Sequence, residues 1–212
     1  TALAAGSVEP ALAGALLVSL RMKGESAEEV RGFANGMRKA AKEVVLENSS
    51  ELIDIVGTGG DGSHSFNIST GAALLSAACG LKVAKHGNRS VSSKSGSADL
   101  LEFLGYRFPM DADGVKAQIK KNGFSFLFAP NFHPAMKHIA PIRQALKART
   151  VFNILGPLTN PANPSFYLLG AFSSEMASLM ASSLSGMDMN RAFVIHGLNG
   201  WDEPTQASNF EL

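Results

Sequence analysis

A glycine-rich segment, which follows a short apolar run at residues 52–56, is the first part of the chain whose residue types could do chemistry. It reads Gly-Thr-Gly-Gly-Asp-Gly from residue 57 to residue 62. Glycines allow backbone N–H groups to approach an anion closely, and such groups at the end of a strand can close around a phosphate. The segment therefore predicts a phosphate-binding loop.

Two common nucleotide-binding motifs do not fit this loop. The spacing G-x-G-x-x-G is typical of dinucleotide sites, but that fingerprint also needs an acidic residue at the end of the second strand. The second strand expected here ends in Lys85 and His86. A Walker loop requires a lysine after its last glycine, where this sequence has Ser63. Nicotinamide dinucleotides and ATP are therefore disfavoured as ligands.

Three polar residues, Asn67, Ser69 and Thr70, stand at the start of the helix that we expect over residues 68–79. Their side chains lie beside the free N–H groups of a first helical turn, and together these groups form an anion site. Simple N-capping by Asn67 is the alternative. Three polar residues after a glycine loop favour phosphate binding over capping alone.

The run Lys-His-Gly-Asn-Arg at residues 85–89 lies where the second strand should end. Ligands bind at the carboxyl ends of the strands in open α/β sheets. Lys85 and Arg89 could neutralise phosphate charge, and Gly87 between them allows close approach of the backbone. This run predicts a cationic wall for the same anion site.

Predicted strands and helices alternate along most of the chain. Strands are expected at residues 52–56, 82–84, 124–128, 167–169 and 192–195, and helices at 68–79, 97–104, 115–121, 134–146 and 175–184. Such alternation is typical of a parallel sheet. Two helices precede it, the first marked by Leu12, Leu16 and Leu20 at helical spacing and the second by a Ser26–Glu29 capping box. The predicted fold is α/β, with a small N-terminal helical domain and a larger domain whose sheet is mainly parallel.

Composition narrows the class of protein. The 212 residues are 45% hydrophobic and 17% charged, which is ordinary for a globular protein. The formal net charge of +1 gives no electrostatic argument for a nucleic-acid or membrane partner. A single cysteine, Cys79, allows no internal disulfide, and no apolar run is long enough to span a bilayer. We expect a cytoplasmic protein.

Eight motifs, taken in order, resemble those of the anthranilate phosphoribosyltransferases. They lie at residues 57–61, 67–70, 85–89, 95–99, 133–136, 150–161, 196–197 and 202–203. The resemblance covers essentially the whole chain. Members of this family normally begin somewhat earlier and continue well past residue 212, so we expect this chain to be a fragment.

The resemblance implies a domain arrangement. Residues 1–48 would form the helical domain, with the helix at 133–147 packing on it. Residues 49–132 and 148–212 would form an α/β domain that binds 5-phosphoribosyl 1-diphosphate and is incomplete at its C-terminus. The active site would lie between the two domains, and a homodimer would form through the helical domain.

The resemblance also implies a reaction in tryptophan biosynthesis. The phosphoribosyl group of 5-phosphoribosyl 1-diphosphate would pass to the amine of anthranilate, giving N-(5-phosphoribosyl)anthranilate and diphosphate. The leaving diphosphate needs charge neutralisation, and the sugar passes through an oxocarbenium-like state. An uncharged amine attacks without a strong base, so no residue is assigned as an acid or base and much of the rate should come from holding both substrates together.

The site residues that the resemblance implies fall into three sets. The donor set is Gly57, Thr58, Gly59, Gly60, Asp61, Asn67, Ser69, Thr70, Lys85 and Ser97. The acceptor set is Gly57, His86, Asn88, His133, Arg143 and Gly156, in which Arg143 would grip the acceptor carboxylate. The metal set, for Mg²⁺, is Ser69, Asp202 and Glu203, whose hard oxygen atoms suit that ion.

Two alternatives stay open. A pyrimidine-nucleoside-phosphorylase-like enzyme would share the fold and a glycine loop but would use free phosphate and a base, and the 85–89 run with Arg143 argues against it. A non-catalytic relative that binds nucleic acid would have a broken donor loop and a basic surface. This loop is intact and the net charge is near zero.

Overall fold

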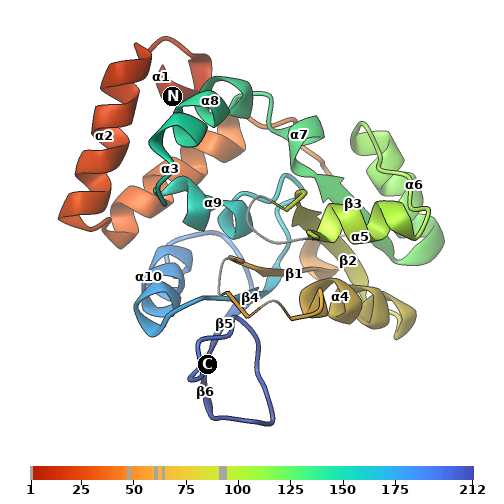
Figure 1. Ribbon diagram of the computed structural model, residues 1–212. Helices are drawn as coiled ribbons and strands as arrows, with labels where there is room; N and C mark the ends of the chain where they lie inside the picture. The colour runs from red at the N-terminus through yellow and green to blue at the C-terminus, as the bar shows by residue number, and fades with distance from the viewer. Residues whose placement is uncertain (1, 47–48, 60–61, 64, 91–94) are drawn as a thin grey trace.

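The computed structural model describes residues 2–46, 49–59, 62–63, 65–90 and 95–212. Figure 1 shows a group of helices above a sheet that carries further helices on its two faces. The predicted combination of a helical N-terminal part with a mainly parallel α/β part is confirmed.

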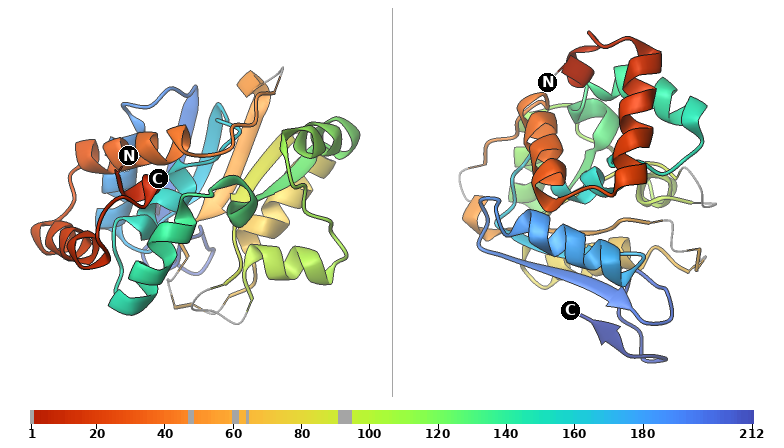
Figure 2. Two further views of the ribbon diagram at one scale, coloured as in Figure 1. Left: turned by 90° about the horizontal axis from the view of Figure 1, so that it is seen from above. Right: turned by 90° about the vertical axis from the view of Figure 1, so that its left-hand side faces the viewer.

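The helical part joins the start of the chain to a segment from its middle. It contains α1 (Ala2–Ala5), α2 (Pro10–Lys23) and α3 (Ala27–Lys39), and α8 (Met136–Leu146) packs on α1 and α2 (Figure 2). The Ser26–Glu29 capping box is present at the start of α3, as predicted. Helix α8 begins at Met136 rather than at Pro134, because residues 133–138 form successive turns with hydrogen bonds between residues three apart.

Six strands form the sheet in the described part of the chain, in the order β3-β2-β1-β4-β5-β6. They are β1 (Leu52–Gly57), β2 (Lys82–Gly87), β3 (Phe124–Phe128), β4 (Phe166–Gly170), β5 (Arg191–Gly197) and β6 (Phe210–Glu211). The first five pair in parallel, and β6 pairs antiparallel with β5. Strand β2 lies on one side of β1, and β4, which comes later in the chain, lies on its other side. A ligand crevice is therefore expected between the carboxyl ends of β1 and β4.

The remaining helices cover the two faces of this sheet or connect its strands. They are the 3₁₀ turn η1 (Ser49–Glu51), α4 (Ile68–Ala78), α5 (Ser97–Phe103), α6 (Ala112–Asn122), α7 (Ala129–Phe132), α9 (Phe152–Leu158) and α10 (Ser174–Leu184). The sequence did not predict α7 or α9. Helix α9 contains Gly156 and Pro157 and is apolar on almost every side, so it shows no amphipathic pattern.

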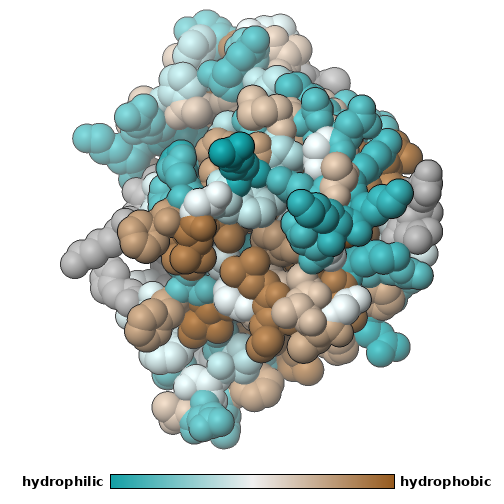
Figure 3. All heavy atoms as spheres, turned by 90° about the vertical axis from the view of Figure 1, so that its right-hand side faces the viewer, coloured by the Kyte–Doolittle hydropathy of each residue, from teal (hydrophilic) through white to brown (hydrophobic). Residues whose placement is uncertain are grey.

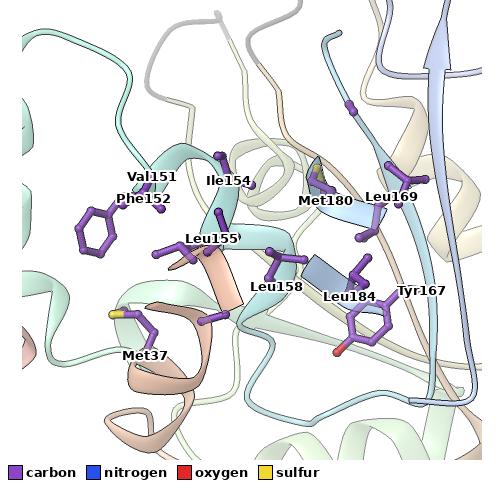
Figure 4. Packing of buried hydrophobic residues seen from close by; sticks show 14 of the residues in the cluster. Met37, Val151, Phe152, Ile154, Leu155, Leu158, Tyr167, Leu169, Met180 and Leu184 are labelled. Atoms are coloured by element: carbon purple, nitrogen blue, oxygen red, sulfur yellow. The ribbon is translucent and has the colours of Figure 1, made fainter. Parts of the chain in front are cut away.

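The largest hydrophobic cluster joins the helical part to the sheet. Figure 4 shows α9 at its centre, with Met37 of α3 on one side and Leu169 of β4 on the other. Met180 and Leu184 of α10 close the cluster beside the sheet. Because one core spans both parts, α9 has a fixed place between them.

The opposite face of the sheet is less completely covered. Helices α4 and α5 pack over β1, β2 and β3, whereas Phe193 of β5 is 43% exposed. Leu75, Phe103 and Leu104 are exposed on or near these two helices, and Figure 3 shows apolar side chains gathered on that side of the molecule. None of the described helices combines the length and the hydrophobicity that a bilayer-spanning segment needs.

Candidate active site

The crevice between β1 and β4 is occupied by the backbone and side chain of Asp202, which follows β5. The carboxylate of Asp202 accepts a hydrogen bond from the Gly59 N–H at 3.0 Å. Asp202 itself is buried, with 8% of its surface exposed. A Cβ at Gly57 would overlap the Asp202 carboxylate, and one at Gly170 would overlap its carbonyl oxygen. Two glycines at facing strand ends thus make the space in which an acidic residue sits.

The predicted donor loop begins at this crevice. The Thr58 N–H donates to the carbonyl of Gly170 at 2.9 Å, which fixes the start of the loop against β4. Gly59 is exposed and has a φ of +63°, a conformation that favours glycine. Gly60 and Asp61, which the sequence also assigns to the donor, lie outside the described residues.

The first turn of α4 brings the next three donor residues to the same end of the sheet. Asn67 is the N-cap residue, yet its side chain makes no capping hydrogen bond and instead donates to the carbonyl of Gly96 at 3.4 Å. Ser69 is half-buried and Thr70 is buried in the first turn of this helix. The capping role considered for the Asn67 side chain is therefore not what this geometry shows.

A second loop, which joins β2 to α5, lies beside that helix end. The carbonyl of Asn88 accepts hydrogen bonds from the Ser97 hydroxyl at 3.2 Å and from the Ala98 N–H at 3.3 Å. These contacts link a predicted acceptor residue to a predicted donor residue. The guanidinium of Arg89 pairs with Asp99 and Glu102, so its charge faces α5 rather than the crevice.

Lys85, the predicted donor cation, is buried with only 2% of its surface exposed. Its ammonium donates a hydrogen bond to the carbonyl of Ile55. Burial lowers the pKa of Lys85 to about 8, while the carboxylates of Asp54, Asp202 and Glu203 act in the opposite direction. A group with that pKa is mostly protonated at neutral pH, so the site holds a positive charge beneath the crevice.

A pair of buried histidines forms one wall of the predicted acceptor region. The ring centroids of His86 and His133 are 4.9 Å apart, and each residue is 4% exposed. Nδ1 of His86 lies 3.0 Å from the carbonyl oxygen of Gly156. In the described part of the chain Nε2 of His86 is buried without a hydrogen-bond partner, while the Thr159 backbone acts on the His133 ring.

Burial decides the charge of this pair. It lowers the pKa of His86 to about 3 and the pKa of His133 to about 4, because a charged imidazole loses its hydration there. Both rings are therefore neutral at pH 7. A neutral, apolar wall suits an aromatic ring better than a charged one.

Helix α8 brings Arg143 to the same region, where it meets α9. The guanidinium carbon of Arg143 lies 5.8 Å from the centroid of the Phe152 ring, and burial lowers the pKa of this guanidinium. Phe152 and Gly156 are one turn apart on α9, so they share a face of that helix. Arg143 therefore meets α9 at the Phe152 ring, and His86 meets it one turn later at the Gly156 carbonyl.

The acids after β5 fit a divalent cation in their chemistry and in their place. Asp202 and Glu203 are adjacent, and the space that Gly57 and Gly170 leave open holds the first of them at the crevice. Carboxylate and hydroxyl oxygens are the donors that Mg²⁺ prefers, together with substrate phosphates and water. In the described residues no three His, Cys, Asp or Glu side chains form a cluster that could hold a metal without other ligands.

Three residues of this site were not assigned by the sequence analysis. Gly170 is needed for the approach of Asp202, and Asp54 and Asn160 form a buried hydrogen-bonded pair beneath His86. An aspartate in the middle of an apolar strand was the available signal for Asp54. The other two become recognisable only when segments distant in the sequence are placed side by side.

Comparison with known proteins identifies this arrangement. Residues 49–210 match the α/β domain of a glycosyl transferase family, and residues 1–41 match its helical bundle domain. Curated relatives include anthranilate phosphoribosyltransferases from Polynucleobacter asymbioticus, 50% identical, and from Dehalococcoides mccartyi, 52% identical. Each alignment covers 93% of this chain and 58% of the relative, so the chain spans little more than half their length.

Solved structures give the same picture. Anthranilate phosphoribosyltransferase from Thermus thermophilus superposes with a TM-score of 0.86 at 48% identity, over 96% of this chain and 61% of that one. The enzyme from Saccharomyces cerevisiae in complex with PRPP and Mg superposes with a TM-score of 0.84 at 34% identity, over 92% of this chain and 55% of that one.

Proposed function

This chain belongs to the glycosyl transferase family whose helical bundle and α/β domains it matches, and on that premise we propose that the complete protein is an anthranilate phosphoribosyltransferase. It would transfer the phosphoribosyl group of 5-phosphoribosyl 1-diphosphate to the amine of anthranilate, releasing diphosphate. The reaction would serve tryptophan biosynthesis in the cytoplasm.

One observation carries the proposal. The neutral His86–His133 pair reaches α9 at Gly156 and Arg143 reaches it one turn earlier at Phe152, whereas glycine backbone and the Asp202 carboxylate line the crevice of the same sheet. The first region suits an aromatic carboxylate and the second suits a diphosphate with a metal ion. A nucleoside phosphorylase would need neither a carboxylate clamp nor a diphosphate site. The relatives named above support the same choice.

For the donor, we assign binding to the backbone around the crevice and to polar side chains beside it. The set is Gly57, Thr58, Gly59, Gly60, Asp61, Asn67, Ser69, Thr70, Lys85 and Ser97. The Gly59 N–H, once Asp202 releases it, and N–H groups at the start of α4 would bind phosphate oxygens. Lys85 would add a positive charge from below, since burial strengthens its field at the crevice.

We assign Mg²⁺ to Ser69, Asp202 and Glu203. When bound, the ion would supply charge neutralisation for the diphosphate as it leaves. Either oxygen of the Asp202 carboxylate could bind the ion, and only binding through Oδ2 would compete with its hydrogen bond from the Gly59 N–H.

For the acceptor, Arg143 would hold the carboxylate through charge-assisted hydrogen bonds. His86, Asn88, His133, Gly57 and Gly156 would line the space for the aromatic ring and its amine. The amine nitrogen would form a bond to C1 of the ribose while the bond from C1 to the diphosphate oxygen breaks. The aromatic amine is uncharged at neutral pH, so positioning of the two substrates would provide much of the rate.

We also propose a homodimer that forms through the helical domain. The exposed apolar side chains Leu12 and Leu16 of α2, which are 64% and 43% exposed, could contribute to such a contact. Sedimentation equilibrium of the complete protein measures this directly, and a monomer at micromolar concentration would rule the dimer out.

The function is tested by measuring diphosphate release by the complete protein with 5-phosphoribosyl 1-diphosphate. Release should require both anthranilate and Mg²⁺, and omission of either should reduce it to background. Replacement of anthranilate by benzoate, which keeps the carboxylate but lacks the amine, should also give no release. A protein that binds the donor but releases no diphosphate with anthranilate would have a different acceptor. A folded protein that does not bind the donor would not be a phosphoribosyltransferase.

A further inference from the structure

A buried carboxylate lies directly beneath the predicted acceptor wall, in a part of the site to which no role has been assigned. Asp54, in the middle of β1, has no exposed surface. Its Oδ1 accepts a hydrogen bond from the His86 N–H at 3.2 Å, and its Oδ2 accepts one from Nδ2 of Asn160 at 2.8 Å. Each carboxylate oxygen therefore holds a different segment of the chain.

Asn160, the partner of Asp54, also has no exposed surface. Its Nδ2 donates a second hydrogen bond to the carbonyl of Ala84 at 2.7 Å, and its Oδ1 accepts from the Ala162 N–H at 2.9 Å. The amide thus makes contacts with β1, with β2 and with the turn that follows α9.

These contacts form a closed chain around the acceptor wall. Asp54 and Asn160 fix the backbone of β2 on either side of Lys85, at Ala84 and at His86. Asn160 comes shortly after α9, and the His86 ring returns to that helix through the carbonyl of Gly156 at 3.0 Å. The same pair therefore determines how the end of β2 lies against α9.

We propose that Asp54 and Asn160 act as a positioning pair, which sets Lys85 for the donor and His86 for the acceptor relative to α9. This inference rests on the function proposed above, because those two roles belong to it. Neither member of the pair belongs to the residues assigned to substrate binding; both act through the residues of β2.

The energetic cost of the pair supports a role beyond packing. Burying a carboxylate is unfavourable, and apolar residues of similar volume at such positions are often neutral or stabilising. Burial raises the pKa of Asp54 to about 6, while the Lys85 ammonium and the hydrogen bonds from Asn160 and His86 act in the opposite direction. A carboxylate kept at this cost is consistent with positioning of a functional strand end.

The test uses the complete protein with two variants and one matched control. Asn160→Ala removes both hydrogen bonds that the amide donates. Asp54→Asn keeps the volume but replaces one acceptor oxygen by an NH₂ group. The control is Ser183→Ala, which removes another fully buried polar group, one that donates to the carbonyl of Leu179 within α10. Thermal unfolding of all three measures their loss of stability.

We expect kcat/KM to fall by roughly 10- to 100-fold for both substrates in each positioning variant, since small displacements of binding groups have effects of this size. Ser183→Ala should lose stability without a change in either constant. Should both positioning variants fold and keep kcat/KM within about twofold of the wild type, the proposal would be overturned.

A second readout separates this inference from the proposed function. The ¹⁵N chemical shifts of the His86 ring in the ligand-free protein report its contact with Gly156, so they should move in both variants and stay unchanged in Ser183→Ala. If the wild type has no transferase activity, the function fails, while moving shifts still support positioning of His86. Unchanged shifts in both variants would overturn the positioning role whether or not the enzyme is active.

Discussion

The two halves of the predicted site are built in different ways. The acceptor half consists of buried side chains, among them His86 and His133, and hydrogen bonds from three segments of the chain hold it in place. The donor half consists largely of backbone, and Gly59 there is exposed. In the described part of the loop, the Gly59 N–H is engaged by a carboxylate that we assign to metal binding.

This difference indicates that the two halves of the site are formed to different extents before their ligands bind. A buried and hydrogen-bonded wall is already in its binding geometry, so few side chains have to move when an aromatic acceptor binds. In the donor half, by contrast, the Gly59 N–H is bound to the Asp202 carboxylate, and a diphosphate could take the place of that carboxylate. We therefore expect the acceptor half to be ready before ligands arrive and the donor half to be completed by its ligand.

The largest loss of activity is expected when a side chain is added in the crevice between β1 and β4. In Gly170→Ala the new Cβ would overlap the carbonyl oxygen of Asp202, so the segment after β5 must move and the metal site with it. Activity should fall by more than about 100-fold, as misplacement of catalytic groups commonly causes. Mg²⁺-dependent donor binding, measured by calorimetry, should weaken in parallel.

The control for this change is Gly32→Ala in α3, where an added Cβ has nothing within 4 Å. That variant should keep full activity and gain roughly 0.5–1 kcal/mol of stability from helix propensity. Donor binding that survives in Gly170→Ala would show that Asp202 has no part in the donor half.

The next effect should fall on the acceptor half alone. Arg143→Ala removes the cation assigned to the acceptor carboxylate, and a lost charge-assisted hydrogen-bonded pair corresponds to a fall of roughly 100-fold in kcat/KM for anthranilate. The donor dissociation constant should not change. Arg149→Ala, which removes another guanidinium lying over a phenylalanine ring, is the control and should keep the wild-type constants. A matching loss of donor affinity in Arg143→Ala would contradict the separation of the halves.

A smaller effect should appear in stability as a function of pH. The pKa values of His86 and His133 are about 3 and about 4 in the folded protein, against roughly 6.5 in an unfolded chain. Between these values the unfolded chain binds more protons, so the free energy of unfolding is highest above pH 6.5 and falls as the pH is lowered. Each histidine should account for about 2 kcal/mol of loss by pH 5.

Urea unfolding between pH 7.5 and pH 5 measures this dependence. His133→Gln should flatten it, because one buried imidazole is gone. An unchanged slope in that variant would mean that the ring is not held in the neutral form by burial.

The smallest effect is expected at Arg89, although it belongs to the cationic run in the sequence. Its guanidinium pairs with Asp99 and Glu102 and lies 5.7 Å from the Phe128 ring centroid. These pairs are substantially exposed, and exposed ion pairs contribute roughly 0–1 kcal/mol. Arg89→Lys should therefore leave donor affinity within about twofold of the wild type. A tenfold loss of donor affinity would instead show that Arg89 takes part in donor binding.

The sequence was most informative where local pattern and fold agree. The strand at residues 124–128 and the Ser26–Glu29 capping box were predicted as they occur, because periodicity and capping chemistry are local. The α/β class followed from the alternation of elements. Helix α9 was missed because it is buried on nearly all sides, so its pattern carries no helical period.

The candidate site was predictable only in part, and for a physical reason. Motif residues could be assigned roles by resemblance, and the glycine loop and the first turn of α4 also by their own chemistry. The burial of Lys85 and the engagement of Arg89 with α5 depend on contacts between distant segments. The hydrogen bond between Asn160 and Asp54 could not be predicted either, because these two residues are far apart in the sequence.

The most direct test of the division between the two halves is hydrogen exchange of the complete protein, measured with and without 5-phosphoribosyl 1-diphosphate and Mg²⁺. We predict that the donor slows exchange of the Gly59 N–H, which only Asp202 holds in the ligand-free protein, and of the first turn of α4. Exchange at the end of β2 and in α9 should already be slow and should stay unchanged. Slowing of exchange at His86 and along α9 on donor binding would contradict this division between the halves, because the ligand would then be needed to order the acceptor half.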